Sequence, residues 1–230
     1  MTATAREDFG SVALEDGEVV STILESVEVG FPIGVIAIER PADPPSLIQE
    51  WCNRADLSRR IPYWAEIWPA SRAIAARLAS SADLDSHRVM DLGCGLGLAG
   101  VAAGLRGARV TFVDHHPDAV LFARRNAMRA GIQRPEFLLA DWRDPTWARP
   151  CDVVLGADLL YDREEHEPLC ELLERLLIGG GSALLADPRR DSAAPFIEAW
   201  RSGGRRAGTT DLGIVPGADV AVALHELRLG

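Results

Sequence analysis

The stretch VMDLGCGLGLAG, residues 89–100, joins a short apolar segment to three glycines at alternate positions. Its first three residues suit a buried strand, and LAGVAAGLRG suits a helix that ends at Gly107. Glycines at the junction let the backbone turn tightly and approach a ligand without interference from a Cβ atom. We therefore expect a ligand-binding loop between a strand and the N-terminus of a helix.

Two interpretations of these glycines compete. Residues 95–100 match the GxGxxG fingerprint of dinucleotide-binding proteins, but that register runs the strand through Asp91, Gly93 and Cys94, which are poor strand formers. If Gly93 is the first turn glycine, the strand ends at Asp91, and its carboxylate lies at the mouth of the loop. A carboxylate there would repel the anionic pyrophosphate of a dinucleotide and attract a cation. The pattern therefore favours a cationic ligand.

Downstream of this loop, short apolar segments alternate with helical segments of ten or more residues. The expected strands are ARVTFVD, PEFLLAD, CDVVLGADLLY and SALLAD, and the C-terminal GADVAVALHELRL alternates like an exposed edge or hairpin strand. This order predicts an α/β fold with a mostly parallel sheet and helices on both faces. Ligands bind such sheets beyond the carboxyl ends of the strands, so functional residues should follow each strand.

The N-terminal part of the chain has a different pattern. Residues 1–18 are polar and predict a frayed end, whereas VVSTILESVEVG and VIAIERP around GFPIG predict an antiparallel hairpin. The segment SLIQEWCNRA predicts a short helix capped by Ser46. We expect an N-terminal elaboration at residues 1–58, serving as a lid or docking wall, and a main domain at residues 59–230.

Composition narrows the class of protein. The formal net charge of −10 argues against nucleic-acid binding, which would need a basic face. No apolar segment is long enough to span a membrane, and the N-terminus lacks the parts of a signal peptide, so we expect a cytoplasmic protein. The four cysteines form no ligand pattern and predict no metal site. All 24 basic residues are arginine, which fits codon bias or an enzyme that modifies lysine and avoids modifying itself.

Acidic residues also follow the later strands. Asp114 lies about 20 residues beyond the glycine loop, where a carboxylate accepts hydrogen bonds from a ribose diol, with helix capping as the alternative. Asp141 and Trp142 suit an exocyclic amine and a purine ring, with a turn and core packing as alternatives. Asp158 and Tyr161 follow the fourth strand, and a carboxylate in a cleft is a candidate functional group, with an N-cap as the alternative.

The segment PYWAEIWPAS, residues 62–71, gathers aromatic residues shortly before the glycine loop. Trp64 and Trp68 lie four positions apart and would share one face of a helical turn. Pro69 suits the first turn of the helix that follows. From these residues alone, core packing is a simpler explanation of both tryptophans than ligand binding.

Together, PYWAEIWPAS, DLGCGLGLAG, DLLY and LLADPRR resemble the class I S-adenosylmethionine-dependent methyltransferases. Within that superfamily they are similar to the seven-β-strand protein-lysine methyltransferase group, which includes the electron-transfer-flavoprotein β-subunit lysine methyltransferases. The resemblance covers roughly residues 60–230. It implies a Rossmann-like, seven-stranded, mostly parallel sheet with an antiparallel last strand, S-adenosyl-L-methionine as cofactor and S-adenosyl-L-homocysteine as product.

The resemblance also implies residue roles. Asp158 and Tyr161 would be catalytic and orient the acceptor amine, whereas Tyr63 and Trp64 would contact the substrate. Trp68 would fold over the cofactor, because an aromatic face attracts a sulfonium cation. The expected cofactor contacts are Trp68, Ser71, Asp91, Gly93, Gly95, Gly97, Asp114, His115, Asp141 and Trp142.

Three hypotheses about function remain open at this point. The acceptor is an accessible lysine of a protein substrate, or it is a small-molecule amine, alcohol or heteroaromatic compound. The third hypothesis is a non-catalytic module that binds the cofactor. In each case we expect a monomer or weak dimer without a metal, a nucleic-acid partner or a membrane partner.

Overall fold

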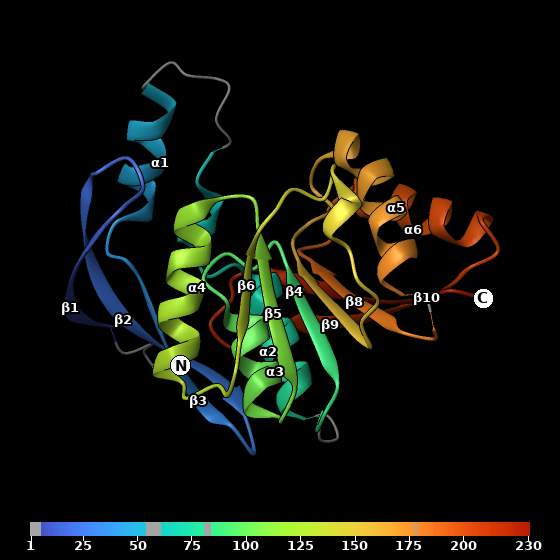
Figure 1. The fold of residues 1–230 in the computed structure, drawn as a ribbon, viewed down its shortest axis with the longest axis horizontal. Helices are drawn as coiled ribbons and strands as arrows, with labels where there is room; N and C mark the ends of the chain where they lie inside the picture. Colours follow the sequence, from blue (N-terminus) through green and yellow to red (C-terminus); the bar gives the residue numbers. More distant parts are fainter. Residues whose placement is uncertain (1–5, 54–60, 81–83, 178) are drawn as a thin grey trace.

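The structure, a computed structural model, describes residues 6–53, 61–80, 84–177 and 179–230. It contains a seven-stranded sheet with the order β6-β5-β4-β7-β8-β10-β9 (Figure 1). Neighbouring strands from β6 to β8 are parallel, and β10 runs antiparallel to β8 and β9. The predicted Rossmann-like sheet is confirmed. Its strands are β4 (Arg88–Leu92), β5 (Arg109–Asp114), β6 (Glu136–Leu139), β7 (Val153–Ala157), β8 (Ser182–Asp187), β9 (Arg206–Ile214) and β10 (Ala221–Arg228).

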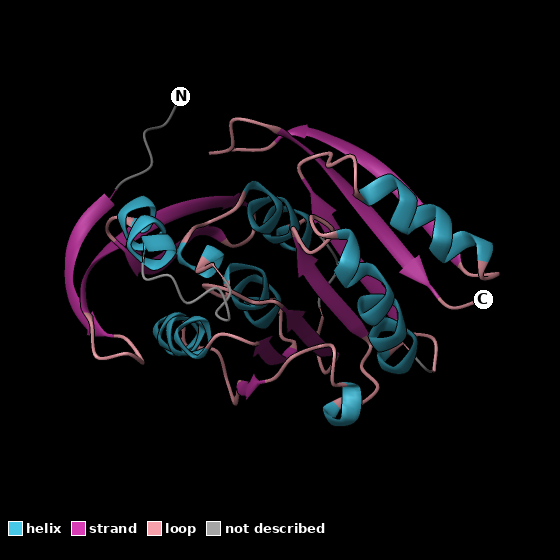
Figure 2. Cartoon of the chain, turned by 90° about the horizontal axis from the view of Figure 1, so that it is seen from above, coloured by secondary structure: helices cyan, strands magenta, loops and turns pink. Residues whose placement is uncertain are grey.

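Helices cover both faces of this sheet (Figure 2). Val89 of β4 belongs to the core formed with α2, α3 and α4, whereas the next residue, Met90, belongs to the core formed with α5 and α6. Because successive side chains point to opposite faces, a strand buried on both faces reads as a continuous apolar run. The helices are α2 (Pro69–Ala79), α3 (Leu98–Leu105), α4 (Pro117–Arg129), α5 (His166–Leu176) and α6 (Ala193–Ser202).

The order of the strands reverses beside β4. Strands β5 and β6 lie on one side of β4, and β7 and β8 lie on the other. The loops after β4 and β7 therefore leave the sheet in different directions and open a crevice between them, the usual ligand site in such sheets. This arrangement brings residues that follow separate strands to one end of the sheet.

The C-terminal strands differ from the sequence-based expectation in one respect. β10 is a hairpin strand, as one of the two alternatives predicted, but it is an interior strand, and the edge position belongs to β9. β9 was not predicted, because its sequence RAGTTDLGI offers few apolar residues and its side chains are mostly exposed. An edge strand needs one bonded neighbour and little apolar surface, so its periodicity is weak.

The N-terminal part forms a separate three-stranded antiparallel sheet, β1-β2-β3, followed by α1 (Pro44–Asn53). The predicted hairpin of β2 (Val19–Gly30) and β3 (Gly34–Pro41) is present. The expectation of a frayed start was wrong for β1 (Arg6–Ala13), an exposed edge strand that pairs with β2 through its backbone. The predicted cap was also wrong, because the Ser46 backbone N–H donates to Asp43 Oδ1 at 3.1 Å and Asp43 precedes the helix.

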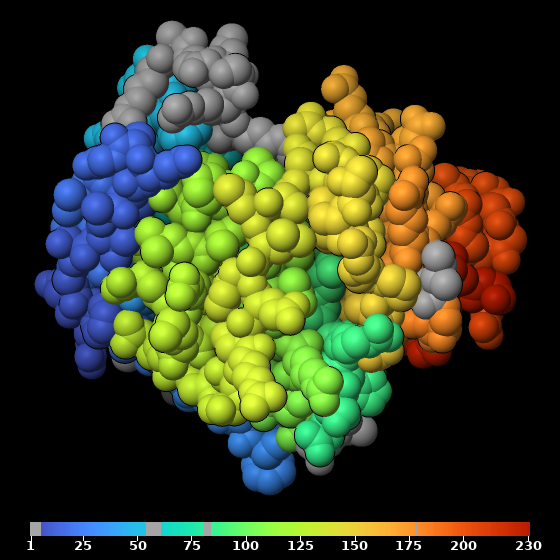
Figure 3. Space-filling model, viewed as in Figure 1, coloured from blue at the N-terminus to red at the C-terminus, as the bar shows by residue number. Residues whose placement is uncertain are grey.

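Polar contacts attach this N-terminal sheet to the main domain. Glu39 of β3 is fully buried and forms ion pairs with Arg125 at 2.8 Å and Arg129 at 2.9 Å, both on α4. The Asn126 side chain accepts from the Glu39 backbone N–H at 2.7 Å and donates to its carbonyl at 3.0 Å, as a neighbouring strand would. Figure 3 shows the blue N-terminal residues packed against the yellow-green residues of α4. The predicted boundary between residues 58 and 59 lies outside the described residues.

None of the described helices is both long enough and apolar enough to span a membrane.

Candidate active site

A cavity of about 690 Å³ lies beyond the carboxyl ends of β4, β5 and β7. The 3₁₀ helix η1 (Tyr63–Ala65) and the start of α2 also contribute to its walls. Its volume is within the range of sites that enclose small molecules. The residues predicted from sequence that line it are Tyr63, Trp64, Trp68, Ser71, Gly93, Gly95, Asp114, His115, Trp142, Asp158 and Tyr161.

The glycine loop approaches the cavity closely. Gly93 has φ +60°, and a Cβ atom there would lie 2.7 Å from Leu159 Cδ2, so a larger residue would be strained and would clash. Gly95 has φ +50°, and a Cβ atom there would lie 3.5 Å from the Trp64 carbonyl oxygen. Gly97 is the left-handed N-cap residue of α3 and does not line the cavity. The loop therefore brings backbone groups to the cavity floor.

Asp114 ends β5 and joins two loops at the cavity. Its Oδ2 accepts from the Gly95 backbone N–H at 2.9 Å, and its Oδ1 accepts from the His116 backbone N–H at 2.9 Å. Burial raises the pKa of Asp114 despite the nearby His115. The His115 ring lies 3.4 Å from Asp114 Oδ1. This carboxylate is therefore fixed in position at the cavity.

Two acidic residues predicted to contact the cofactor lie outside the cavity lining. Asp91 is 2% exposed, and its Oδ2 accepts from the Gly100 backbone N–H at 2.8 Å, behind the loop instead of at its mouth. Burial raises the pKa of Asp91 to about 8. Asp141 forms a two-pronged pair with Arg143, at 2.6 Å between Oδ2 and Nη2, in the turn after β6. Neither Asp91 nor Asp141 therefore lines the cavity, although Asp91 lies close enough to Asp114 for that carboxylate to raise its pKa further.

Aromatic rings surround one end of the cavity. The Trp68 indole N–H donates to the Tyr63 carbonyl at 2.7 Å, and the ring of Tyr63 lies 6.0 Å from that of Trp68 and 6.1 Å from that of Tyr161. Trp64 points toward the core, with its ring 5.2 Å from Phe122, although it also borders the cavity. Trp64 is thus mostly buried, as core packing predicts, whereas Trp68 lies on the rim of the cavity.

Trp142 forms another buried part of the wall. Its indole N–H donates to Glu165 Oε2 at 2.6 Å, which fixes the ring plane next to the glycine loop. A Cβ atom on Gly93 would lie 3.5 Å from this ring. The position suits a flat ligand group beside the indole.

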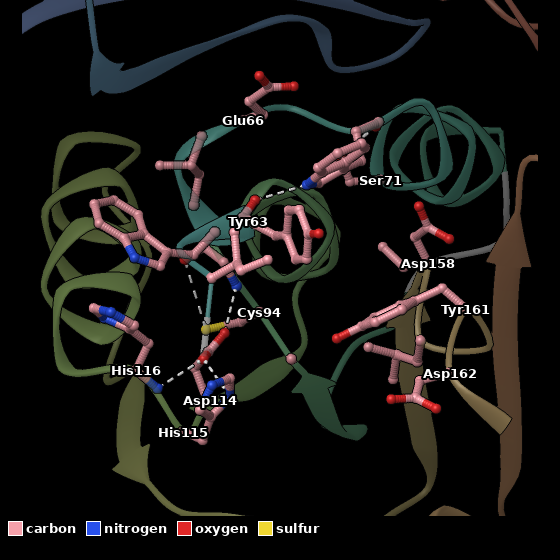
Figure 4. A pocket seen from close by; sticks show the side chains of 18 of the residues that line it. Tyr63, Glu66, Ser71, Cys94, Asp114, His115, His116, Asp158, Tyr161 and Asp162 are labelled. Atoms are coloured by element: carbon pink, nitrogen blue, oxygen red, sulfur yellow. Dashed lines mark hydrogen bonds and ion pairs between the residues drawn. The ribbon is translucent and has the colours of Figure 1, made fainter. Parts of the chain in front are cut away.

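Asp158 lies on the opposite side of the cavity from Asp114 and next to Tyr161 (Figure 4). Its backbone has φ +56°, which is unusual for a residue with a side chain. Both carboxylate oxygens accept from Arg190, from Nε and Nη2, each at 2.6 Å. Sequence reasoning missed Arg190. The one signal in the sequence was that Arg190 follows the end of β8, in LLADPRR, since residues after the strands are expected near the ligand site.

Carboxylates outnumber cations around the cavity. The described lining residues include five carboxylates and a single arginine, Arg190. Because the walls hold little compensating positive charge, a cationic ligand is favoured there over an anionic one. The lining carboxylates are Glu66, Asp114, Asp158, Asp162 and Glu165.

Comparisons with known proteins identify a family for the sequence. A family model described as a methyltransferase domain matches residues 83–216. The electron transfer flavoprotein beta subunit lysine methyltransferase of Xenopus laevis is 30% identical over 131 residues, which cover 56% of this chain and 53% of that protein. Protein N-lysine methyltransferase METTL21A of Danio rerio is 31% identical over 149 residues, which cover 61% of this chain and 64% of that protein. The chain thus spans only part of the length of both relatives.

Solved structures share the fold at low sequence identity. A TehB-like SAM-dependent methyltransferase from Corynebacterium glutamicum has a TM-score of 0.55 and 17% identity, covering 82% of this chain and 99% of that one. Magnesium protoporphyrin IX methyltransferase from Synechocystis, solved with bound SAM, has a TM-score of 0.56 and 19% identity, covering 81% of this chain and 97% of that one. At these identities the similarity concerns the fold.

Proposed function

The chain belongs to the methyltransferase-domain family, and on that premise we propose that it transfers the methyl group of S-adenosylmethionine to the side-chain amine of a protein lysine. The observation that carries this proposal is the carboxylate-rich cavity at the strand ends, with Asp158 and Tyr161 together on one wall. A lysine ammonium entering this cavity would meet negative charge and aromatic faces, both of which attract cations.

The residues present fit the cofactor. Asp114 would accept hydrogen bonds from a ribose diol, and the indole face of Trp142 would lie beside a purine. The glycine loop leaves room for close backbone contact, and Trp68, Ser71 and His115 border the same cavity. Asp91 would act from behind, by holding the start of α3 through the Gly100 N–H. When bound, the cofactor supplies an electrophilic methyl group on a sulfonium.

Methyl transfer of this kind is an in-line displacement, so the protein must align the acceptor nitrogen and exclude water. Lysine has an ordinary pKa of about 10.4 and is mostly protonated near neutral pH. In the proposed mechanism, Asp158 attracts the ammonium and Tyr161 orients it, while solvent takes the proton. The nitrogen lone pair then becomes available in the correct direction. No dedicated general base is required in this scheme.

A second candidate acceptor is a small-molecule amine, alcohol or heteroaromatic compound. The observation that favours it is the size of the cavity and the aromatic side chains Tyr63, Trp68 and Tyr161 at one end, which suit an enclosed organic ligand. In this case the N-terminal elaboration would act as a lid, whereas for a protein substrate it would act as a docking wall.

Incubation with methyl-labelled S-adenosylmethionine and a cell extract tests the proposal. We expect label in a protein band, and methylated lysine in the acid hydrolysate of that band. Label confined to the small-molecule fraction would replace the lysine acceptor with the second candidate. An Asp158→Asn chain is the matched control, because it should bind the cofactor without transferring label. Cofactor uptake without any labelled product would contradict both candidates.

A further inference from the structure

Arg190 occupies the place on Asp158 that a cationic acceptor would need. Its Nε and Nη2 donate to the two carboxylate oxygens at 2.6 Å each, and such a two-pronged pair uses both oxygens in one plane. The guanidinium carbon lies 6.0 Å from the centre of the Tyr161 ring. The two residues proposed to orient the acceptor therefore both already contact one cation from the protein itself.

From this geometry we infer that the Arg190 guanidinium occupies the binding position of the acceptor on Asp158. A substrate ammonium would displace Arg190 from this carboxylate. This inference rests on the proposed function and names a residue that decides which acceptors enter. Arg190 would act as a specificity-determining residue, and the exchange would replace one cation by another at an unchanged carboxylate. The hydrogen bonds to Asp158 hold the pKa of Arg190 above its ordinary value, so the guanidinium remains charged.

Burial explains the direction of the exchange. The Asp158 side chain is 6% exposed, whereas the Arg190 side chain is 36% exposed and lies on the solvent side of the pair. The arginine can therefore move toward water, but the carboxylate cannot. A buried carboxylate without a partner is strongly unfavourable. A neutral acceptor cannot replace the lost charge, so the exchange selects a cation.

The backbone below the guanidinium is held in place while the side chain remains able to change rotamer. The Arg190 backbone N–H donates to Asp187 Oδ1 at 2.7 Å. Asp187 is fully buried, and its Oδ2 lies 2.6 Å from His225 Nε2. Movement of Arg190 would therefore be confined to its flexible side chain, without a change in β8.

An arginine suits this role better than a lysine would. A guanidinium stays protonated and has no available lone pair near neutral pH, so it can lie beside a methyl donor without accepting the methyl group. The chain contains no lysine at all, so none of its own side chains offers the amine proposed as acceptor.

Binding of butylammonium, a surrogate of the lysine side chain, tests the inference without any need for turnover. Calorimetry would be performed on the full chain saturated with S-adenosylhomocysteine. We expect Arg190→Gln to bind butylammonium at least about tenfold more tightly than the wild type, because the competing cation has been removed. Arg189→Gln is the matched control, since the neighbouring guanidinium pairs with the exposed Asp211, and it should bind like the wild type. Equal or weaker binding by Arg190→Gln would overturn the inference.

Further measurements separate folding and catalysis from cation exchange. Unchanged affinity for S-adenosylhomocysteine establishes that Arg190→Gln is folded, and Asp158→Asn should lose butylammonium binding. In a second variant, Arg190→Lys places an amine at the same position, and mass spectrometry after addition of S-adenosylmethionine should find methylation at residue 190 and none in Arg189→Lys. Tighter binding in Arg190→Gln together with an unmethylated Arg190→Lys would support the exchange and count against the proposed methyl transfer. If both Arg190 variants bind S-adenosylhomocysteine normally and have the wild-type affinity for butylammonium, the cation exchange is overturned, while the proposed methyl transfer is unaffected.

Discussion

At the scale of single residues, the carboxylates at the strand ends have different tasks although their sequence settings are alike. Asp114 and Asp158 border the cavity, whereas Asp91 is enclosed behind the glycine loop. Asp91 lies near the end of β4, Asp114 ends β5 and Asp158 follows β7, and the sequence pattern alone does not reveal which way each side chain points. The position of the backbone partner differs: Asp91 accepts from the Gly100 N–H in α3, behind the glycine loop, whereas Asp114 accepts from the Gly95 N–H within the loop.

Replacement of Asp158 by Asn should separate cofactor binding from transfer. Asparagine keeps the shape but loses the charge that attracts an ammonium, so we expect methyl transfer to fall about 100-fold or more, which is typical when an acceptor is misaligned. Affinity for S-adenosylhomocysteine should change less than about twofold, because Asp158 lies on the wall opposite Asp114. Calorimetry and a labelled-methyl assay measure the two quantities. Full turnover in the variant would remove Asp158 from the mechanism.

The buried Asp91 predicts a dependence of stability on pH. Its pKa is about 8 in the folded chain against an ordinary value of 3.8, so between these values the folded state keeps a proton that the unfolded state releases. The free energy of unfolding should therefore fall as pH rises through this interval and level off above about pH 8. Asp91→Asn removes this proton while its side-chain oxygen can still accept from Gly100. Urea unfolding at pH 5 and pH 8 should show a smaller loss in the variant, and an equal loss would refute the assignment.

At the scale of elements, α3 approaches β4 and β5 unusually closely. A Cβ atom on Gly100 would lie 2.3 Å from Phe112 Cε1 and 2.8 Å from Asp91 Oδ2. The glycine therefore sets the distance between helix and sheet, and that distance keeps the preceding loop at the cavity floor. Its role concerns packing against neighbours rather than the turn itself.

Gly100→Ala should destabilise the fold by about 2–3 kcal/mol, since a methyl group must displace a buried ring or a buried carboxylate. Gly208→Ala is the matched control, because a Cβ atom on this strand residue has no neighbour within 4 Å. We expect the control to change stability by less than about 0.5 kcal/mol. Chemical denaturation of both variants measures the difference. Equal stability of the two would show that α3 moves aside easily.

Asn126 on α4 should be among the most sensitive polar residues. Its side-chain amide accepts from the Glu39 backbone N–H and donates to the Glu39 carbonyl. The same amide also donates to the Leu96 carbonyl at 2.9 Å. Asn126→Ala leaves these buried groups without partners, and we expect a loss of about 3 kcal/mol in stability. Asn53→Ala, at the exposed end of α1, should change stability by less than about 0.5 kcal/mol. Similar midpoints for the two variants would contradict the bridging role.

Sequence reasoning found the elements whose patterns arise from burial and missed those that depend on neighbours. The strands and helices of the main domain carry apolar periodicity, and the glycine loop is visible as a local pattern. β1 and β9 are edge strands whose exposed side chains carry no such periodicity. Arg190 was missed for a similar reason, because its pairing with Asp158 joins the ends of two different strands. Contacts between residues that are distant in the sequence produce no regular spacing from which they could be predicted.

At the scale of the whole molecule, the N-terminal sheet and the main domain share one core. Val27 and Ile38 from that sheet are fully buried in the same cluster as Ile74 of α2 and Phe122 of α4. Buried ion pairs reinforce the attachment, since Glu25 of β2 pairs with Arg72 of α2. Burial alone would raise the pKa of Glu25, but the hydrogen bonds and charges of Arg40 and Arg72 together lower it. The N-terminal sheet therefore shares the core around α2 and α4, whereas the core around α5 and α6 belongs to the main domain alone.

We expect the chain to unfold in a single cooperative transition. Urea titrations followed by far-UV circular dichroism and by tryptophan fluorescence should coincide, because one core joins both parts. A chain that begins at residue 59 should be insoluble, since it would expose the apolar faces of α2 and α4 to water. Two separate transitions, or a folded and soluble truncated chain, would show that the N-terminal sheet is an independent appendage.

The amide of Asn126 has a consequence for how this architecture can be recombined. One side chain simultaneously completes the hydrogen bonding of β3 and of the glycine loop, and its length and dual donor and acceptor character leave little freedom for exchange. An N-terminal sheet grafted from another protein would fit only if its last strand offered an unpaired backbone N–H and carbonyl to Asn126 at the position that Glu39 occupies. Such chimaeras are therefore best designed around the register of Glu39, not around similarity in sequence.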